Sequence, residues 1–155
     1  MNSHALIPLA ATILFIPLFF ILILNRPWQR PQRLFFLYLT PALLWSLSDF
    51  VARSVLSLPD FSEIDLVLLK IVICIAIWMG IQLHYFLRSF SSAEAIKPPL
   101  AYILLIGFVA LVALGYIPRG VEATPDIVHV RYGIWFNLIT FLVIALVSRD
   151  LYLLA

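Results

Sequence analysis

A short, strongly basic turn constrains this chain more than any other feature. Residues 25–33 read NRPWQRPQR, with three arginines, two prolines and no acid, and long apolar runs flank them on both sides. An arginine costs about 2.5–3.5 kcal/mol at the centre of a membrane helix on insertion scales, and a proline cannot continue a helix interior. The first apolar run therefore ends at this turn. Because short basic loops stay on the cytoplasmic side of a membrane, the turn also sets the direction of every later segment.

The composition indicates a membrane protein from end to end. Apolar residues make up 64% of the 155 residues and charged residues 12%, whereas soluble domains contain about 45–50% and 25%. The net charge of +2 is too small for a nucleic-acid-binding surface, and the basic residues lie at the edges of apolar runs. We therefore predict one domain over residues 1–155, an all-α, polytopic membrane helix bundle that contacts lipid and binds no nucleic acid.

Five apolar segments predict five transmembrane helices. They cover about residues 5–24, 34–56, 66–87, 100–117 and 132–147 or slightly beyond, and twenty helical residues rise about 30 Å, the thickness of the hydrocarbon core. On the side of the basic turn lie Arg26, Arg30, Arg33, Arg88, Lys97 and Arg149. The opposite loops carry only Arg119 and Arg131. This asymmetry predicts an external N-terminus and a cytoplasmic C-terminus. Beyond Arg149, the apolar end LYLLA is expected either to follow the interface or to precede a further span.

Polar residues in the outer parts of three spans form a candidate ligand-binding pocket. They are Asp49, Arg53, Lys70, Asn137 and Thr140. Ionisable residues inside membrane spans are costly and are functional candidates by default, so packing of the second, third and fifth spans would line a polar pocket open to the outside. The alternative is structural: Asp49 and Arg53, four residues apart on one helix face, neutralise each other, and Lys70 extends to the surface.

A second polar group, Gln82, His84 and Tyr85, lies near the inner end of the third span. His84 is a candidate axial ligand to haem or to a chlorophyll-type pigment; the alternative is an interfacial contact with a neighbouring helix or a lipid head group. His4 and His129 fall on the outer side, so no second histidine of this chain can bracket a haem with His84. No other cofactor contact is predicted.

The sequence carries no motif of an enzyme or of a metal site. It lacks a Gly-rich phosphate loop, an HExxH motif and any Ser-His-Asp set that the topology would bring together. Its single cysteine, Cys74, lies inside an apolar run and can form neither an intramolecular disulfide nor a metal site alone. We therefore expect no catalytic residue and no metal ligand set.

Two segments resemble a known family. The first comprises the basic turn, the pair Phe35 and Phe36, and Trp45; the second reads LHYFL over residues 83–87 and is followed by Phe90. Together they resemble the N-terminal seven-transmembrane sensor region of bacterial histidine kinases and diguanylate cyclases. There, a similar basic turn follows the first span and a Leu-His-Phe-like motif closes the third. The resemblance covers the first five of the seven spans and no output domain, and His84 matches the motif histidine.

The resemblance implies a non-catalytic membrane input module in the bacterial cytoplasmic membrane. Such a module would act through helix–helix contacts with partner proteins, either other membrane subunits or a second copy of the chain. The alternative hypothesis is an accessory or structural subunit of a larger respiratory or photosynthetic membrane complex, in contact with pigment, haem or lipid. A small transporter or lipid-handling protein ranks third, because the sequence has no detectable inverted repeat and no charged residue near the midplane of its spans.

Overall fold

The computed structural model describes residues 3–25, 29–55, 63–91, 101–123 and 128–154, and their structure is almost entirely helical. The elements are the helices α1 (Ser3–Leu24), α2 (Arg30–Val55), α3 (Glu63–Ser91), α4 (Ala101–Ala113) and α5 (Gly133–Leu154), and the strands β1 (Gly120–Ala123) and β2 (Val128–Arg131). The prediction of an all-helical chain is confirmed. The antiparallel β1–β2 hairpin was not predicted, because strands of four residues are too short to give a periodic sequence signal.

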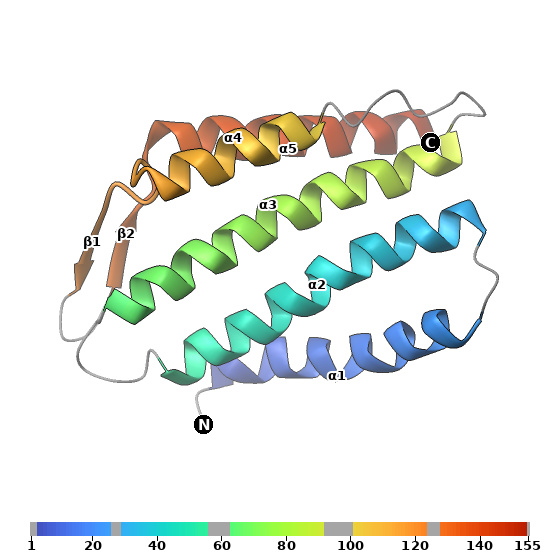
Figure 1. The fold of residues 1–155 in the computed structure, drawn as a ribbon, viewed down its shortest axis with the longest axis horizontal. Helices are drawn as coiled ribbons and strands as arrows, with labels where there is room; N and C mark the ends of the chain where they lie inside the picture. The colour runs from blue at the N-terminus through green and yellow to red at the C-terminus, as the bar shows by residue number, and fades with distance from the viewer. Residues whose placement is uncertain (1–2, 26–28, 56–62, 92–100, 124–127, 155) are drawn as a thin grey trace.

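Helix α3 lies at the centre of the molecule. Figure 1 shows α1, α2 and α3 side by side, with α4 and α5 on the other side of α3. One end of the molecule carries the β1–β2 hairpin and the starts of α3 and α5, and we call it the hairpin end. The opposite end carries the start of α2 and the ends of α3 and α5, and we call it the arginine end after its described arginines, Arg30, Arg33, Arg88 and Arg149.

The main apolar core joins α3 to α4 and α5. On α3, buried side chains recur every fourth residue, at Ile73, Ile77, Ile81 and Tyr85, and this spacing keeps them on one face of the helix. They pack against Ala101, Phe108, Val112, Ile117, Ile139 and Val143. Helix α3 thus anchors both later helices along one stripe of side chains.

A small hydrogen-bonded network joins α1 to α2. Ser46 is completely buried, and its hydroxyl donates to the carbonyl oxygen of Pro8 at 2.7 Å. The hydroxyl of Thr12 lies 2.9 Å from that of Ser46. Polar contacts of this kind are a common link between helices in an apolar environment. The α1–α2 pair is therefore fixed by polar side chains as well as by apolar packing.

Helix α4 is shorter than the predicted span over residues 100–117. Gly115, with φ of 80°, follows its end; the amide of Tyr116 donates to Leu111 O at 2.9 Å and that of Gly115 to Val112 O at 3.1 Å. This is a Schellman motif, which requires a left-handed residue and stops the helix. The 13 residues of α4 rise about 20 Å, less than the hydrocarbon core.

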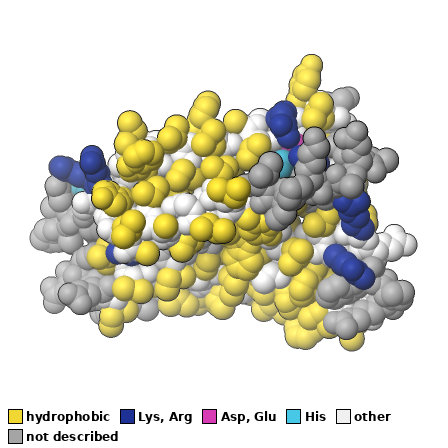
Figure 2. Space-filling view, turned by 45° about the horizontal axis from the view of Figure 1, so that its top comes forward, with side chains coloured by type: hydrophobic (Ala, Val, Ile, Leu, Met, Phe, Trp, Pro, Cys, Tyr) yellow, Lys and Arg dark blue, Asp and Glu magenta, His cyan; other side chains and the backbone are white. Residues whose placement is uncertain are grey.

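The last helix is longer than predicted: α5 continues past Val147 to Leu154. Four helices of the described residues are long and apolar enough to cross a membrane, over Leu6–Leu24, Arg30–Val51, Ile64–Phe90 and Gly133–Leu154, and α4 is a shorter apolar helix. Figure 2 shows one face of the molecule, on which apolar side chains cover the middle and basic side chains gather towards the two ends. This distribution suits a multi-pass membrane protein.

A tight contact between α3 and α5 at Gly80 gives a stability prediction. A Cβ atom added at Gly80 would lie 2.6 Å from Cγ1 of the buried Val143, so Gly80→Ala forces the two helices apart. We expect a loss of roughly 1–3 kcal/mol, as in other overpacked cores, measured by unfolding in detergent micelles.

The matched control is Gly107→Ala on α4, where no atom lies within 4 Å of the added Cβ. The double variant Gly80→Ala with Val143→Ala should recover part of the loss, because it removes the clashing methyl group. Equal stability of Gly80→Ala and the unchanged chain would contradict the close approach.

Candidate functional site

Five polar side chains from three helices meet near the arginine end, and we call them the polar cluster. They are Gln82, His84 and Tyr85 of α3, Tyr102 of α4 and Asp150 of α5. The first three are the inner polar group that the sequence analysis singled out. Asp150 is 1% exposed, Gln82 2% and His84 4%, so these groups must satisfy one another within the protein.

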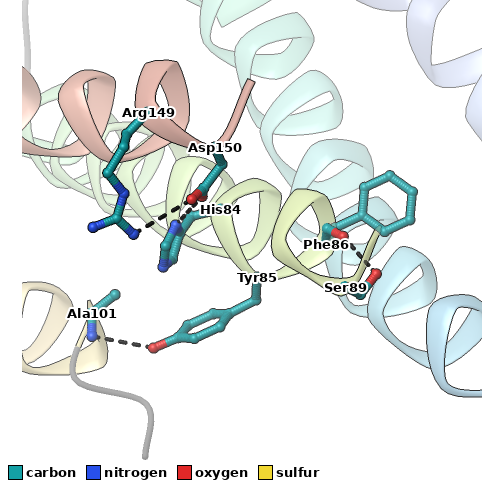
Figure 3. Close-up of polar contacts among 7 residues, drawn as sticks. All are labelled: His84, Tyr85, Phe86, Ser89, Ala101, Arg149 and Asp150. Carbon is teal, nitrogen blue, oxygen red and sulfur yellow. Dashed lines mark hydrogen bonds and ion pairs between the residues drawn. The ribbon is translucent and has the colours of Figure 1, made fainter. Parts of the chain in front are cut away.

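The centre of the polar cluster is a hydrogen-bonded pair between α3 and α5. Nδ1 of His84 contacts Oδ2 of Asp150 (Figure 3). The contact joins an imidazole nitrogen to a carboxyl oxygen, a pair in which one group donates the shared proton and the other accepts it. The second oxygen, Oδ1, lies 3.5 Å from Nη2 of Arg149, whose side chain is 55% exposed. Asp150 therefore connects a buried histidine to an arginine at the protein surface.

The remaining members of the polar cluster attach the start of α4 to α3. The backbone N–H of Ala101, the first residue of α4, donates to the Tyr85 hydroxyl at 3.2 Å (Figure 3), and the first amides of a helix need such an external acceptor. The side-chain amide of Gln82 donates to the Tyr102 hydroxyl. The two tyrosine rings are stacked, with centroids 5.5 Å apart. Helix α4 is thus positioned by two hydrogen bonds and one ring contact.

Sequence reasoning missed Asp150, because Arg149 and Asp150 together resembled the end of a span. A signal was nevertheless present. On α5, Ile139 and Val143 are buried against α3, and Asp150 follows Val143 by two helical turns, so the three residues share one stripe. A charged residue that continues a buried stripe needs a partner, and His84 supplies it.

The two segments that carry the family resemblance meet in space. Phe35 of the first segment packs against Phe86 of the second, with ring centroids 5.2 Å apart, and Tyr38 stacks on Phe86 at 6.2 Å. Phe36 turns to the other side and contacts Phe19 of α1 at 4.8 Å. These aromatic contacts join α1, α2 and α3. Phe86 comes two residues after His84, so the aromatic contact and the His84–Asp150 pair lie on opposite sides of α3.

The chemistry open to the polar cluster is limited. The described hydroxyl groups nearby are engaged elsewhere: Tyr85 with Ala101, Tyr102 with Gln82, and Ser89 with the carbonyl of Phe86 at 2.6 Å. No described serine completes a Ser-His-Asp set with the pair. A carboxylate on Nδ1 leaves Nε2 of His84 as the nitrogen for an axial ligand bond, the arrangement typical of metal-bound histidines. No group of three His, Cys, Asp or Glu side chains suited to a metal ion occurs in the described part of the chain.

The residues of the predicted outer group lie on three helices, α2, α3 and α5. Asp49 lies on α2 and Lys70 on α3, both partly buried, whereas Asn137 on α5 is exposed. Thr140 of α5 has a buried hydroxyl for which the described residues provide no partner, and the side chain of Arg53 lies outside the described set. Helices α2 and α5 contact different sides of α3 and do not contact each other. A ligand pocket formed by these five residues stays a prediction.

Comparison with models of known protein families, with curated proteins and with solved structures gives no match.

Removing one member of the His84–Asp150 pair should destabilise the packing of α3 on α5. We expect His84→Leu and Asp150→Leu each to cost about 1–3 kcal/mol, since each leaves a buried polar group without its partner. The double variant should be more stable than the sum of the two losses predicts, because two apolar side chains can replace a buried pair.

Unfolding of the four proteins in detergent micelles measures this coupling. His84→Asn is the conservative control, because its amide N–H occupies the position of Nδ1 and keeps a donor for Asp150. Strictly additive losses would show that the pair is not a coupled contact.

Proposed function

We propose that this chain is a non-catalytic input module of a bacterial membrane signalling protein. In this proposal five helices span the cytoplasmic membrane, the hairpin end faces outward and the arginine end faces the cytoplasm. The module acts through helix–helix contacts with partner proteins. The observation that carries the proposal is the His84–Asp150 pair, because it links the cytoplasmic ends of α3 and α5 through the histidine of the sensor-like motif.

A buried hydrogen-bonded pair suits a signalling role because it gives the helices two distinct arrangements, one with the hydrogen bond formed and one with it broken. Helix α3 contacts α2, α4 and α5, so a shift of α3 relative to α5 changes the cytoplasmic surface as well as the core. A signal changes this equilibrium only if it binds one arrangement more tightly than the other. In the proposal, Asp49 and Lys70, on the neighbouring helices α2 and α3, belong to the outer region that receives the signal.

The distribution of charge supports the proposed orientation. The described arginines Arg30, Arg33, Arg88 and Arg149 lie at one end of the molecule, and an excess of basic residues favours the cytoplasmic side. Helix α4, at 13 residues, is short for a span of about 30 Å. Its crossing therefore requires flanking residues to extend the apolar segment, or a locally thinner bilayer.

The second candidate function is that of an accessory or structural subunit of a respiratory or photosynthetic membrane complex. The open arrangement of the helices favours it. Among the described elements α1 contacts only α2, and large apolar side chains are exposed along α1 and α5, including Leu14 at 68% and Phe141 at 67%. Neighbouring subunits or lipid would cover these surfaces. In that setting His84 would contact haem or pigment through Nε2.

The orientation predicts which tyrosine positions an impermeant thiol reagent reaches. In a Cys74→Ser background, Tyr116→Cys, at the hairpin end, should be labelled on intact cells. Tyr152→Cys, at the arginine end, should be labelled only after the membrane is opened. Both side chains are exposed, at 51% and 82%, so packing does not limit either reaction. Labelling of Tyr152→Cys on intact cells would reverse the topology and overturn the proposed input and output sides.

Purification of the native protein in mild detergent separates the two functions. A signalling module should be recovered with a protein that carries a cytoplasmic kinase or cyclase domain, and without visible absorption from haem or pigment. An accessory subunit should migrate with a large respiratory or photosynthetic assembly, with cofactor absorption that His84→Leu reduces. A chain that migrates alone under gentle conditions would contradict both.

A further inference from the structure

Arg149 has binding capacity that its contacts with the described residues do not use. A guanidinium group has five N–H donors, and Asp150 is the partner recorded for Arg149 among the described residues. The separation of 3.5 Å is long beside the 2.7–2.9 Å of a strong charge-assisted hydrogen bond. The other carboxylate oxygen is engaged with His84. Most donors of this exposed arginine are therefore available to an external anion.

The surroundings of Arg149 favour an anion. Arg30 and Arg33 are exposed at the same end of the molecule, and Arg88 is partly buried there. The one acid at this end among the described residues is Asp150, which is 1% exposed and bonded to His84. The described part of the arginine end therefore presents positive charge to a membrane surface. Clusters of arginine beside membrane spans attract anionic lipid head groups.

One face of α5 combines exposed apolar side chains with an exposed arginine, the combination that a phospholipid requires. Leu142, Ala145, Arg149 and Tyr152 follow one another at spacings of three and four residues, which places them on one side of the helix. All four are exposed. The small Ala145 leaves room for an acyl chain beside Leu142, below the guanidinium group. Tyr152, one turn beyond Arg149 on the same face, offers a hydroxyl as a second donor.

We propose that this face of α5 binds an anionic phospholipid, with the phosphate held by Arg149 and one acyl chain lying over Ala145 and Leu142. The phosphate competes with Oδ1 of Asp150 for the guanidinium group, while Oδ2 stays with His84. The site needs α5 to cross the membrane and Arg149 to lie at its surface. It does not depend on the signalling role, so the two proposals can fail separately.

Native mass spectrometry of the full chain in detergent micelles tests the site. Phosphatidylglycerol and phosphatidylcholine with identical acyl chains are titrated separately. We expect preferential retention of phosphatidylglycerol, and a loss of about five-fold in Arg149→Gln, the contribution of one arginine near an anionic surface. Arg149→Lys should keep most of the retention. The matched control is Arg131→Gln at the hairpin end, which should retain as much phosphatidylglycerol as the unchanged chain.

A second variant tests the acyl-chain contact without removing the arginine. Ala145→Phe fills the space beside Leu142 and should lower the retention of phosphatidylglycerol while thermal stability stays unchanged. The proposal is overturned if Arg149→Gln and Ala145→Phe both retain the lipid as the unchanged chain does. It is equally overturned if phosphatidylcholine is retained as well as phosphatidylglycerol, because the site would then not select an anionic head group. Complete displacement of the lipid by inorganic phosphate would also overturn it, because the site would then not recognise a lipid.

Discussion

A carboxylate buried between apolar helices must find its hydrogen-bond donors within the protein, and at Asp150 this requirement organises one end of the molecule. Asp150 is nearly inaccessible and is bonded to His84, so α5 must continue beyond Arg149 and lie against α3. On α3, His84 follows Gly80 by four residues, and on α5, Asp150 follows Val143 by seven. The apolar close approach at Gly80 and the polar pair therefore lie on the same two helix faces. Each contact supports the geometry that the other needs.

The two sides of α3 are held by different chemistry. Towards α4 and α5 there is a continuous apolar stripe that ends in the polar cluster. Towards α2 the contact at the arginine end is aromatic, between Phe86 and the rings of Phe35 and Tyr38. Two residues that are two positions apart on α3 therefore make contacts on its two sides: His84 on the polar side and Phe86 on the aromatic side. A rotation of α3 that disturbs the His84–Asp150 pair also disturbs the contact of Phe86 with α2, because both residues belong to one helix and a close-packed interior transmits strain.

The sequence predicted most of the helices and part of the site, for reasons that differ by residue. The basic turn and the apolar runs indicate where α1, α2 and α3 lie, since arginine and hydrocarbon exclude each other. Helix α2 nevertheless begins at Arg30, within the predicted turn, because a proline such as Pro31 is tolerated in the first turn of a helix. Gln82, His84 and Tyr85 were found because polar residues within a span are conspicuous. Asp150 was missed because a charged pair beside Arg149 has the appearance of a helix end. The outer pocket was inferred from depth alone, which does not determine which helices are neighbours, and it stays a prediction.

The position of Asp150 connects the protein surface at the arginine end to the helix packing. One oxygen of its carboxylate bonds to a buried side chain of α3 and the other faces an exposed arginine. An anion that binds Arg149 competes with Asp150 for the guanidinium group. His84 is then the remaining partner of Asp150. By linkage, an arrangement of α3 and α5 that alters the His84–Asp150 pair must also alter the affinity of Arg149 for that anion. Coupling between a surface and a core therefore needs no long chain of contacts here, because a single carboxylate belongs to both.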